Sequence, residues 1–579
     1  MRATYVVMIA VVAALLSACV SIPNDSPIER GRDVGVRDDP QLNSNVPPGP
    51  QPGASREEIV AGYFDAMLAY PRDDDLTRSF LTEGAAQDWD PGFSLVIYDE
   101  REISLDTDEV VVSARRLGVL DERGAWSAAS TVEQVALDVR TERIDGQWRV
   151  TDPPVGTYID ADYFDRYYEP FSLYYFDPTG AILAPDPVYY LLGEQTATEL
   201  VENLLRGPGP SLGGVVSTAV PDGLELTGSV QVRSNGLADI PLSDGAAQMP
   251  AVQRRLLAAQ LTWTLRPLAE VDSIALEVDG EALDVAGSGA RVPVDEFSGY
   301  DPAVLGASRQ LFGLGRQGLV SVSADALSRV PGVLGTGWPG ARSAAVDLTA
   351  SQAALVGSPG TEVAVGPLSA VEPTSSLWYR DGTDVLRPAW DVHGVLWIVD
   401  NTGDGAVVAT ATARGSRPVD VPGISGREVL GFAVSRDGTR LAAIVRDGEQ
   451  SRLVISLVDR DADAPAQVSL SAADSIATPG LTFSSTGDVA WMSPISLAVL
   501  ANDEGGDLQP LEIRIDGSDL STFDGFLPVR PTSLAASAAA DVPLMVGGGA
   551  PRVIYQRSLE AGWASYGPIG RVRAITYPG

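Results

Sequence analysis

The chain has 579 residues, one histidine, one cysteine and no lysine, and its formal net charge is −36. The missing lysine excludes P-loop phosphate binding, Schiff-base chemistry and the kinase ion pair, and the single His and Cys exclude zinc sites and disulfides. The negative charge argues against binding to nucleic acid or lying flat on an anionic membrane.

The first residues have the three parts of a bacterial export signal. Arg2 supplies positive charge, residues 5–16 form an apolar run, and two small residues precede Cys19. The run is shorter than the roughly 20 residues that a membrane-spanning helix needs. The sequence therefore predicts an exported protein.

Residues 16–19, Leu-Ser-Ala-Cys, resemble the lipobox of bacterial lipoproteins. The resemblance implies a signal peptide over 1–18, cleavage between Ala18 and Cys19, and S-diacylglycerol and N-acyl groups on Cys19. The thiolate is the side chain that can form a stable thioether with lipid. The alternative is an ordinary signal peptide, or an uncleaved anchor, with an incidental cysteine.

Residues 19–55 are dense in Pro, Gly, Asp and Asn and have almost no apolar periodicity, so they predict a disordered tether. A folded α+β domain is expected over 56–165. Ser55 and Glu58 form a capping-box pattern at the start of a helix. The other expected elements are a helix over 76–89, strands at 94–98, 109–114 and 135–142, and a turn at 145–146. The order of elements weakly resembles the cone-shaped fold of nuclear transport factor 2 (NTF2)-like domains.

Residues 166–295 predict an α/β sandwich that resembles the GerMN domain of spore-germination and envelope proteins. A helix over 196–206 ends at Gly207-Pro208, and Asn235-Gly236 indicates a β-hairpin. A long helix over 250–265 then precedes a strand at 273–280. Packing accounts for the apolar residues of this domain.

Residues 300–579 lose helical periodicity and consist of short apolar strands separated by Gly-Asp turns. Comparable units at 389–399, 432–445 and 481–492 recur at intervals of about 43–53 residues, the period of a β-propeller blade. Five units are visible and the length allows six or seven. We therefore expect an all-β propeller, because a closed ring buries both faces of each blade.

Three local motifs give no functional site. The Gly313, Gly315 and Gly318 pattern matches a dinucleotide fingerprint, but a strand follows it where pyrophosphate binding needs a helix N-terminus. His393 occupies a turn and is expected to be exposed. Carboxylates at 459, 461 and 463 begin like a calcium loop but lack its later ligands. No catalytic, cofactor-binding or metal-binding residue is predicted.

The chain resembles the LpqB lipoproteins of actinobacteria in the order of its segments: a lipobox, a tether, an NTF2-like segment, a GerMN domain and a propeller. Residues 300–314, 388–400 and 434–442 carry the match. The resemblance implies a lipid-anchored protein on the extracytoplasmic face of the cell membrane. It also implies a non-catalytic partner of an MtrB-type sensor histidine kinase in the MtrA–MtrB system, affecting envelope homeostasis and division.

Two other functions stay open at this point. One is a structural lipoprotein that binds a cell-wall polymer. The other is a propeller glycosidase, which needs neither His nor Lys and would bring two or three carboxylates together at the propeller mouth, about 5–9 Å apart.

Overall fold

The computed structural model describes residues 45–579 apart from short gaps. The predicted signal peptide, the lipidation of Cys19 and most of the tether lie outside the described residues. In the described part of the chain, no helix combines the length and apolarity needed to cross a membrane. The gaps are 92–93, 107–108, 304–305, 370–373, 479, 484–486, 503–504, 540, 550–551, 559–561 and 568–569, and the side chains of 130–133 are also not described.

The first domain begins with α2 (Arg56–Ala66), and its predicted capping box is confirmed. The Ser55 hydroxyl accepts a hydrogen bond from the Glu58 amide at 3.2 Å, and the Glu58 carboxylate accepts one from the Ser55 amide at 2.7 Å. The single helix expected over 76–89 is wrong. It is two helices, because Leu81 bridges to Val150 and Thr82 caps a new start. They are α3 (Asp74–Arg78) and α4 (Glu83–Asp88).

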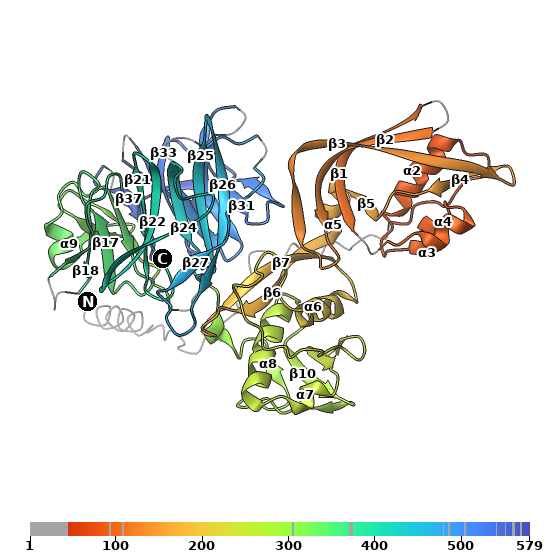
Figure 1. Ribbon diagram of the computed structural model, residues 1–579, viewed down its shortest axis with the longest axis horizontal. Helices are drawn as coiled ribbons and strands as arrows, with labels where there is room; N and C mark the ends of the chain where they lie inside the picture. Colours follow the sequence, from red (N-terminus) through yellow and green to blue (C-terminus); the bar gives the residue numbers. More distant parts are fainter. Residues whose placement is uncertain are drawn as a thin grey trace, which may run out of the picture. The chain divides into compact units, whose positions relative to one another are not determined.

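Helices α2 to α4 lie against one side of an antiparallel sheet to which one parallel strand is added (Figure 1). Val60 and Phe64 of α2 pack with Val110 and Val112 of the sheet. The α+β class is confirmed, whereas the NTF2-like resemblance stays a prediction. In the order β4-β3-β2-β1-β5, the strands are β1 (Leu95–Asp106), β2 (Glu109–Leu120), β3 (Trp126–Ile144), β4 (Gln147–Asp152) and β5 (Thr157–Asp160).

The second domain is an α/β unit, as the sequence predicts. Helices α6 and α8 bury Leu200, Leu204, Leu257 and Leu261 in one core with both of its sheets. Gly236 has φ +75°, which suits the predicted hairpin between β8 and β9. The elements are α5 (Ala161–Tyr167), β6 (Tyr168–Phe176), β7 (Leu183–Leu191), α6 (Thr196–Leu205), β8 (Gln231–Val232), β9 (Leu237–Pro241), α7 (Gly245–Gln248), α8 (Ala251–Leu265), β10 (Ser273–Val278), β11 (Glu281–Ala282), β12 (Val292–Pro293) and the 3-10 helix η1 (Ser298–Tyr300).

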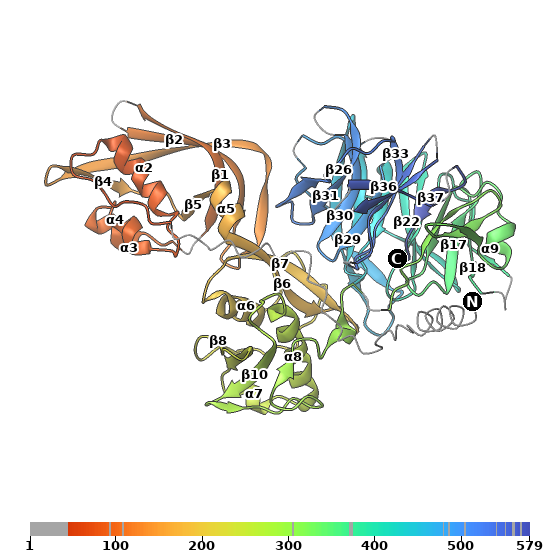
Figure 2. The ribbon, with the colours of Figure 1, turned by 180° about the vertical axis from the view of Figure 1, so that it is seen from behind.

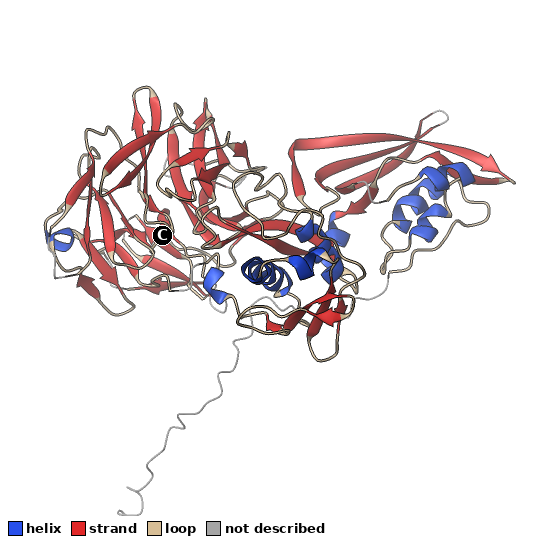
Figure 3. Cartoon of the chain, turned by 60° about the horizontal axis from the view of Figure 1, so that its bottom comes forward, coloured by secondary structure: helices blue, strands red, loops and turns tan. Residues whose placement is uncertain are grey.

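The third domain is the predicted propeller, and its described residues form six sheets (Figures 2 and 3). The first blade is β13 (Leu311–Leu314), β14 (Leu319–Val322) and β15 (Leu327–Arg329) with β37 (Arg573–Thr576), and the helix α9 (Val333–Thr336) follows β15. The second blade is β16 (Ser343–Val346), β17 (Gln352–Val356), β18 (Val363–Pro367) and β19 (Ser376–Tyr379). The third blade is β20 (Ala389–Trp390), β21 (Leu396–Thr402), β22 (Gly405–Thr412) and β23 (Gly415–Val419). The fourth is β24 (Val429–Val434), β25 (Arg440–Asp447), β26 (Gln450–Arg460), β27 (Val468–Leu470) and β28 (Asp474–Ser475); the fifth is β29 (Val489–Ser493), β30 (Ser496–Asn502), β31 (Leu508–Arg514) and β32 (Leu520–Thr522); the sixth is β33 (Pro531–Ala535), β34 (Met545–Gly548), β35 (Ile554–Ser558) and β36 (Gly562–Tyr566).

The ring closes through β37, which is the innermost strand of the first blade and pairs with β13. Phe312 lies opposite Thr576 in this pairing. Strand β37 also contacts β16 on one side and β33 on the other. Distant segments of the domain therefore share one sheet, and in the described part of the ring the inner strand of each blade contacts those of the blades beside it.

Aspartates hold the turns between the first and second strands of several blades. The Asp347 carboxylate accepts the amides of Ser351 and Gln352, each at 2.7 Å. Asp391 and Asp437 play the same part in the third and fourth blades. These bonds explain the recurring Asp in the sequence, because a short polar side chain satisfies amides that the turn leaves unpaired.

Candidate functional site

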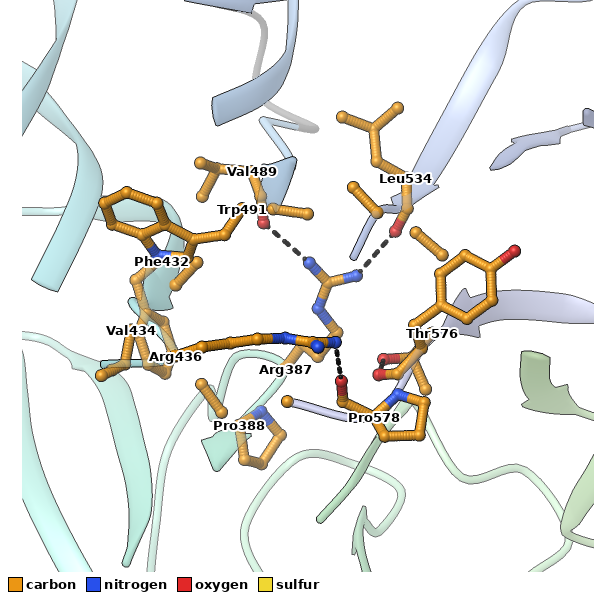
Figure 4. Close-up of a pocket in the computed structure, with 17 residues that line it drawn as sticks. Arg387, Pro388, Phe432, Val434, Arg436, Val489, Trp491, Leu534, Thr576 and Pro578 are labelled. Carbon is orange, nitrogen blue, oxygen red and sulfur yellow. Dashed lines mark hydrogen bonds between the residues drawn. The ribbon is translucent and has the colours of Figure 1, made fainter. Parts of the chain in front are cut away.

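The inner strands of the propeller surround a cavity of about 50 Å³. Residues of β20, β24, β29, β33 and β37 line it, and two arginine side chains extend into the middle of the ring (Figure 4). Arg387 lies just before β20, and Arg436 lies just after β24. This axial cavity is one concave site of the propeller.

Arg387 joins three blades. Its guanidinium donates to the Asp488 carboxylate at 2.6 Å and to the carbonyl oxygens of Val489 and Leu534, both at 3.0 Å. Burial raises the pKa of Asp488, although Arg387 and two amides oppose the shift. The arginine is thus held on the cavity wall by an ion pair and by carbonyl groups of the fifth and sixth blades.

Arg436 is buried with different partners. Its guanidinium donates to the carbonyl oxygens of Ala303 at 3.1 Å and Pro578 at 2.8 Å. Burial lowers the pKa of Arg436 to about 10, an effect that Asp301 partly opposes. Among the described residues, no carboxylate forms an ion pair with this guanidinium. Arg436 therefore brings a positive charge to the cavity that only neutral oxygens contact directly.

The cavity does not offer the carboxylate pair of a glycosidase. Among the described residues, the 17 that line it include no Asp or Glu. The carboxylate of Asp488, just before β29, is occupied by Arg387. A glycosidase needs one carboxylic acid and one free carboxylate on opposite sides of the scissile bond. This geometry gives no support to glycoside hydrolysis at the axis of the ring.

The glycine and aspartate motifs serve local structure. Gly313 lies in β13, and a tight turn containing Gly315 leads to Gly318 and β14. A Cβ at Gly318 would lie 2.1 Å from the Leu334 carbonyl oxygen, so close backbone packing requires glycine there.

The aspartates at the end of β26 also form a turn. The Asp461 carboxylate accepts the amides of Asp463 and Ala464, while Asp459 accepts the Ser469 hydroxyl. Within the described ranges, no three His, Cys, Asp or Glu residues are grouped so as to hold a metal ion.

The expectation of an exposed His393 is wrong. Its side chain is only 11% exposed, and Nε2 lies 3.4 Å from the buried Asp177 carboxylate of the second domain. Nearby, the Arg440 guanidinium donates to the Pro185 carbonyl oxygen at 2.7 Å. The turns of the third and fourth blades therefore pack on the β6–β7 hairpin. A contact between domains leaves no signal in the local pattern of a turn.

Acid should weaken the folded state through Asp177. Burial opposes ionisation of this carboxyl group, but the nearby His393 imidazole and the hydrogen bonds from Thr179 and the Ile182 amide outweigh burial and lower its pKa. The stabilisation is therefore complete above the unfolded-state pKa, about 3.9, and is lost as pH falls toward the lower folded-state value.

We expect Asp177→Asn to reduce the free energy of unfolding by about 1–3 kcal/mol at pH 7. The difference from wild type should shrink below about pH 4. Denaturant titrations from pH 7 to pH 3 measure it, with the exposed Asp404→Asn as the charge-matched control. A difference that stays constant down to pH 3 would contradict the assignment.

A second concave site lies on the outer part of the fifth and sixth blades, and the sequence pattern did not reveal it. The groove has a volume of about 530 Å³ and is lined by Phe523, Phe526, Trp563 and Arg530 among others. Phe526 is 87% exposed. Exposed aromatic rings beside polar groups in a concave surface are typical of binding sites.

Family models match three consecutive stretches of the chain. The N-terminal domain of lipoprotein LpqB matches 49–165, the sporulation and spore germination domain matches 172–284, and the LpqB β-propeller domain matches 317–574. This order of domains defines a class of protein: a lipoprotein with a GerMN-type domain and a C-terminal propeller. The chain is similar to LpqB lipoproteins in its N-terminal domain and in its propeller.

Relatives over most of the length support this similarity. Lipoprotein LpqB of Cutibacterium acnes is 28% identical over 91% of each chain. The Thermobifida fusca protein of the same name is 28% identical over 96% of this chain and 98% of its own. These relatives are named as lipoproteins and not as enzymes.

Solved structures similar to parts of the chain include two bacterial proteins. The first GerMN domain of the sporulation protein GerM from Bacillus subtilis is 22% identical, with a TM-score of 0.18, over 22% of this chain and 92% of that one. TolB from Acinetobacter baumannii is 12% identical, with a TM-score of 0.35, over 57% of this chain and 86% of that one.

Proposed function

We propose that this protein is anchored by lipid on Cys19 to the extracytoplasmic face of the cell membrane and modulates an MtrB-type sensor histidine kinase without catalysis. Through the MtrA–MtrB system it would affect envelope homeostasis and division. The observation that carries the proposal is the match of the first and third domains to LpqB family models, with a sporulation and spore germination domain between them. The lipobox-like residues 16–19 supply the anchor.

Modulation requires binding but no chemistry. A protein held only by lipid acts across the membrane through a partner that spans it. If it binds one state of the kinase better than the other, a difference of about 1–3 kcal/mol shifts the kinase equilibrium 5- to 150-fold.

Site-specific crosslinking in intact cells tests the partner. A photoreactive amino acid replaces one exposed residue in each domain: Val155 (69% exposed), Val252 (72%) or Phe526 (87%). We expect at least one position to capture the sensor kinase, and the positive position identifies the contacting domain. Failure of all three positions to capture the kinase, with efficient expression of each variant, would count against the proposal.

Binding of a cell-wall polymer is a second candidate, and the groove beside Phe526 favours it. Phe523 and Trp563 form an edge-to-face pair with ring centroids 6.1 Å apart, next to the exposed Phe526 ring. Such apolar ring surfaces can pack against sugar rings while polar neighbours bind hydroxyl groups. For this candidate, Phe526→Ala should weaken binding to isolated cell walls several-fold and leave kinase signalling unchanged.

A further inference from the structure

Two side chains of the axial cavity have hydrogen-bonding groups that the described residues satisfy only in part: the Arg436 guanidinium and the Trp491 indole. Arg387 is neutralised by Asp488, but the directly bonded partners of Arg436 are neutral carbonyl oxygens. Trp491 lines the same cavity and is 6% exposed. Among the described residues, its indole N–H has no acceptor. Buried donors and cations of this kind are costly unless an acceptor meets them.

The positive charge of the axial cavity contrasts with the net charge of the chain. The chain as a whole has a formal charge of −36, yet among the described residues its axial cavity is lined by two arginine side chains and by no Asp or Glu side chain. A surrounding of low dielectric strengthens the attraction between a guanidinium and an anion. The electrostatic potential of the two arginines therefore favours an anionic ligand in the cavity, although the chain as a whole is negatively charged.

The volume of the axial cavity also limits the size of the group that it can bind. A water molecule needs roughly 10–15 Å³ of such space, so a cavity of about 50 Å³ admits a group of a few heavy atoms. Carboxylate and phosphate groups have that size. Their oxygens also match the planar fork of donors on a guanidinium.

We propose that the axial cavity of the propeller binds an oxyanion, a carboxylate or phosphate group, between Arg387 and Arg436. Arg436 provides the charge that lacks an ion-pair partner, and Arg387 provides a second guanidinium whose charge Asp488 offsets. Figure 4 shows both side chains reaching the middle of the cavity from different blades. The site holds a small anion or the acidic end of a larger ligand.

Calorimetric titration of the purified full-length protein in detergent tests the proposal. Inorganic phosphate and acetate are added separately at pH 7 and constant ionic strength, with chloride as the reference anion. We expect saturable binding of one ion per chain in the millimolar range. Tighter binding of phosphate assigns the site to phosphate groups, and tighter binding of acetate assigns it to carboxylates.

Three variants separate this site from general salt effects. Arg436→Gln should weaken binding at least tenfold, whereas the exposed Arg417→Gln, which removes the same charge, should leave it unchanged. Asp488→Asn should tighten binding several-fold, because it removes the carboxylate that offsets Arg387. If Arg436→Gln does not fold by near-UV circular dichroism, Asp488→Asn decides. Absence of saturable binding, equal affinity in Arg436→Gln, or unchanged affinity in Asp488→Asn would overturn the proposal.

Discussion

Replacing Cys19 with serine should release the protein from the membrane fraction. Serine has no thiolate to accept the diacylglyceryl group, so the anchor is never formed. Each acyl methylene buried in the bilayer contributes about 0.8 kcal/mol, and two or three chains hold a protein firmly where one does not. The Cys19→Ser variant should therefore lose nearly all of its association with the membrane.

Metabolic labelling with a fatty-acid analogue, followed by membrane fractionation, measures this effect. Wild type and Ser17→Ala, which keeps a small residue before the cleavage site, should both be labelled and sediment with membranes. Cys19→Ser should be unlabelled and leave the membrane fraction. Continued labelling of the serine variant would show that the lipobox interpretation is wrong.

The second large effect should come from Arg460→Met in the propeller. Arg460 pairs with Asp391 at 2.7 Å, and the two side chains are 1% and 0% exposed. Asp391 also accepts the Trp397 indole N–H at 3.0 Å. Removing the arginine leaves a buried carboxylate without its counter-charge, which typically costs about 3–5 kcal/mol of stability.

Chemical denaturation monitored by tryptophan fluorescence measures this cost through the propeller transition. The control is Arg417→Met on the exposed strand β23, which should change stability by less than about 0.5 kcal/mol. A loss below about 1 kcal/mol for Arg460→Met would mean that the pair is solvated or replaced by other partners.

Local signals in the sequence predicted much of the fold. The Ser55 capping box places the start of α2, and the Asn235-Gly236 turn places a hairpin, because each depends on residues close together in the chain. The blade period predicted the propeller for the same reason. The break between α3 and α4 was missed, since it depends on the pairing of Leu81 with a distant strand.

Local sequence patterns could not predict the candidate site. Arg387 and Asp488 are 101 residues apart in the chain and meet only because the ring closes. His393 was expected in solvent, yet the second domain covers it through Asp177. Phe526 sits in a loop without periodicity, and its exposure in a groove depends on how neighbouring blades pack. Such sites follow from tertiary structure, which the sequence pattern does not specify.

Phosphorylation of the partner response regulator tests the proposed kinase modulation most directly. It would be measured in a strain lacking this protein and in the same strain complemented with wild type or Cys19→Ser at equal protein levels. We expect the deletion to change the phosphorylated fraction several-fold and wild type to restore it, whereas the unanchored variant should not. An unchanged phosphorylated fraction in the deletion strain would contradict the account.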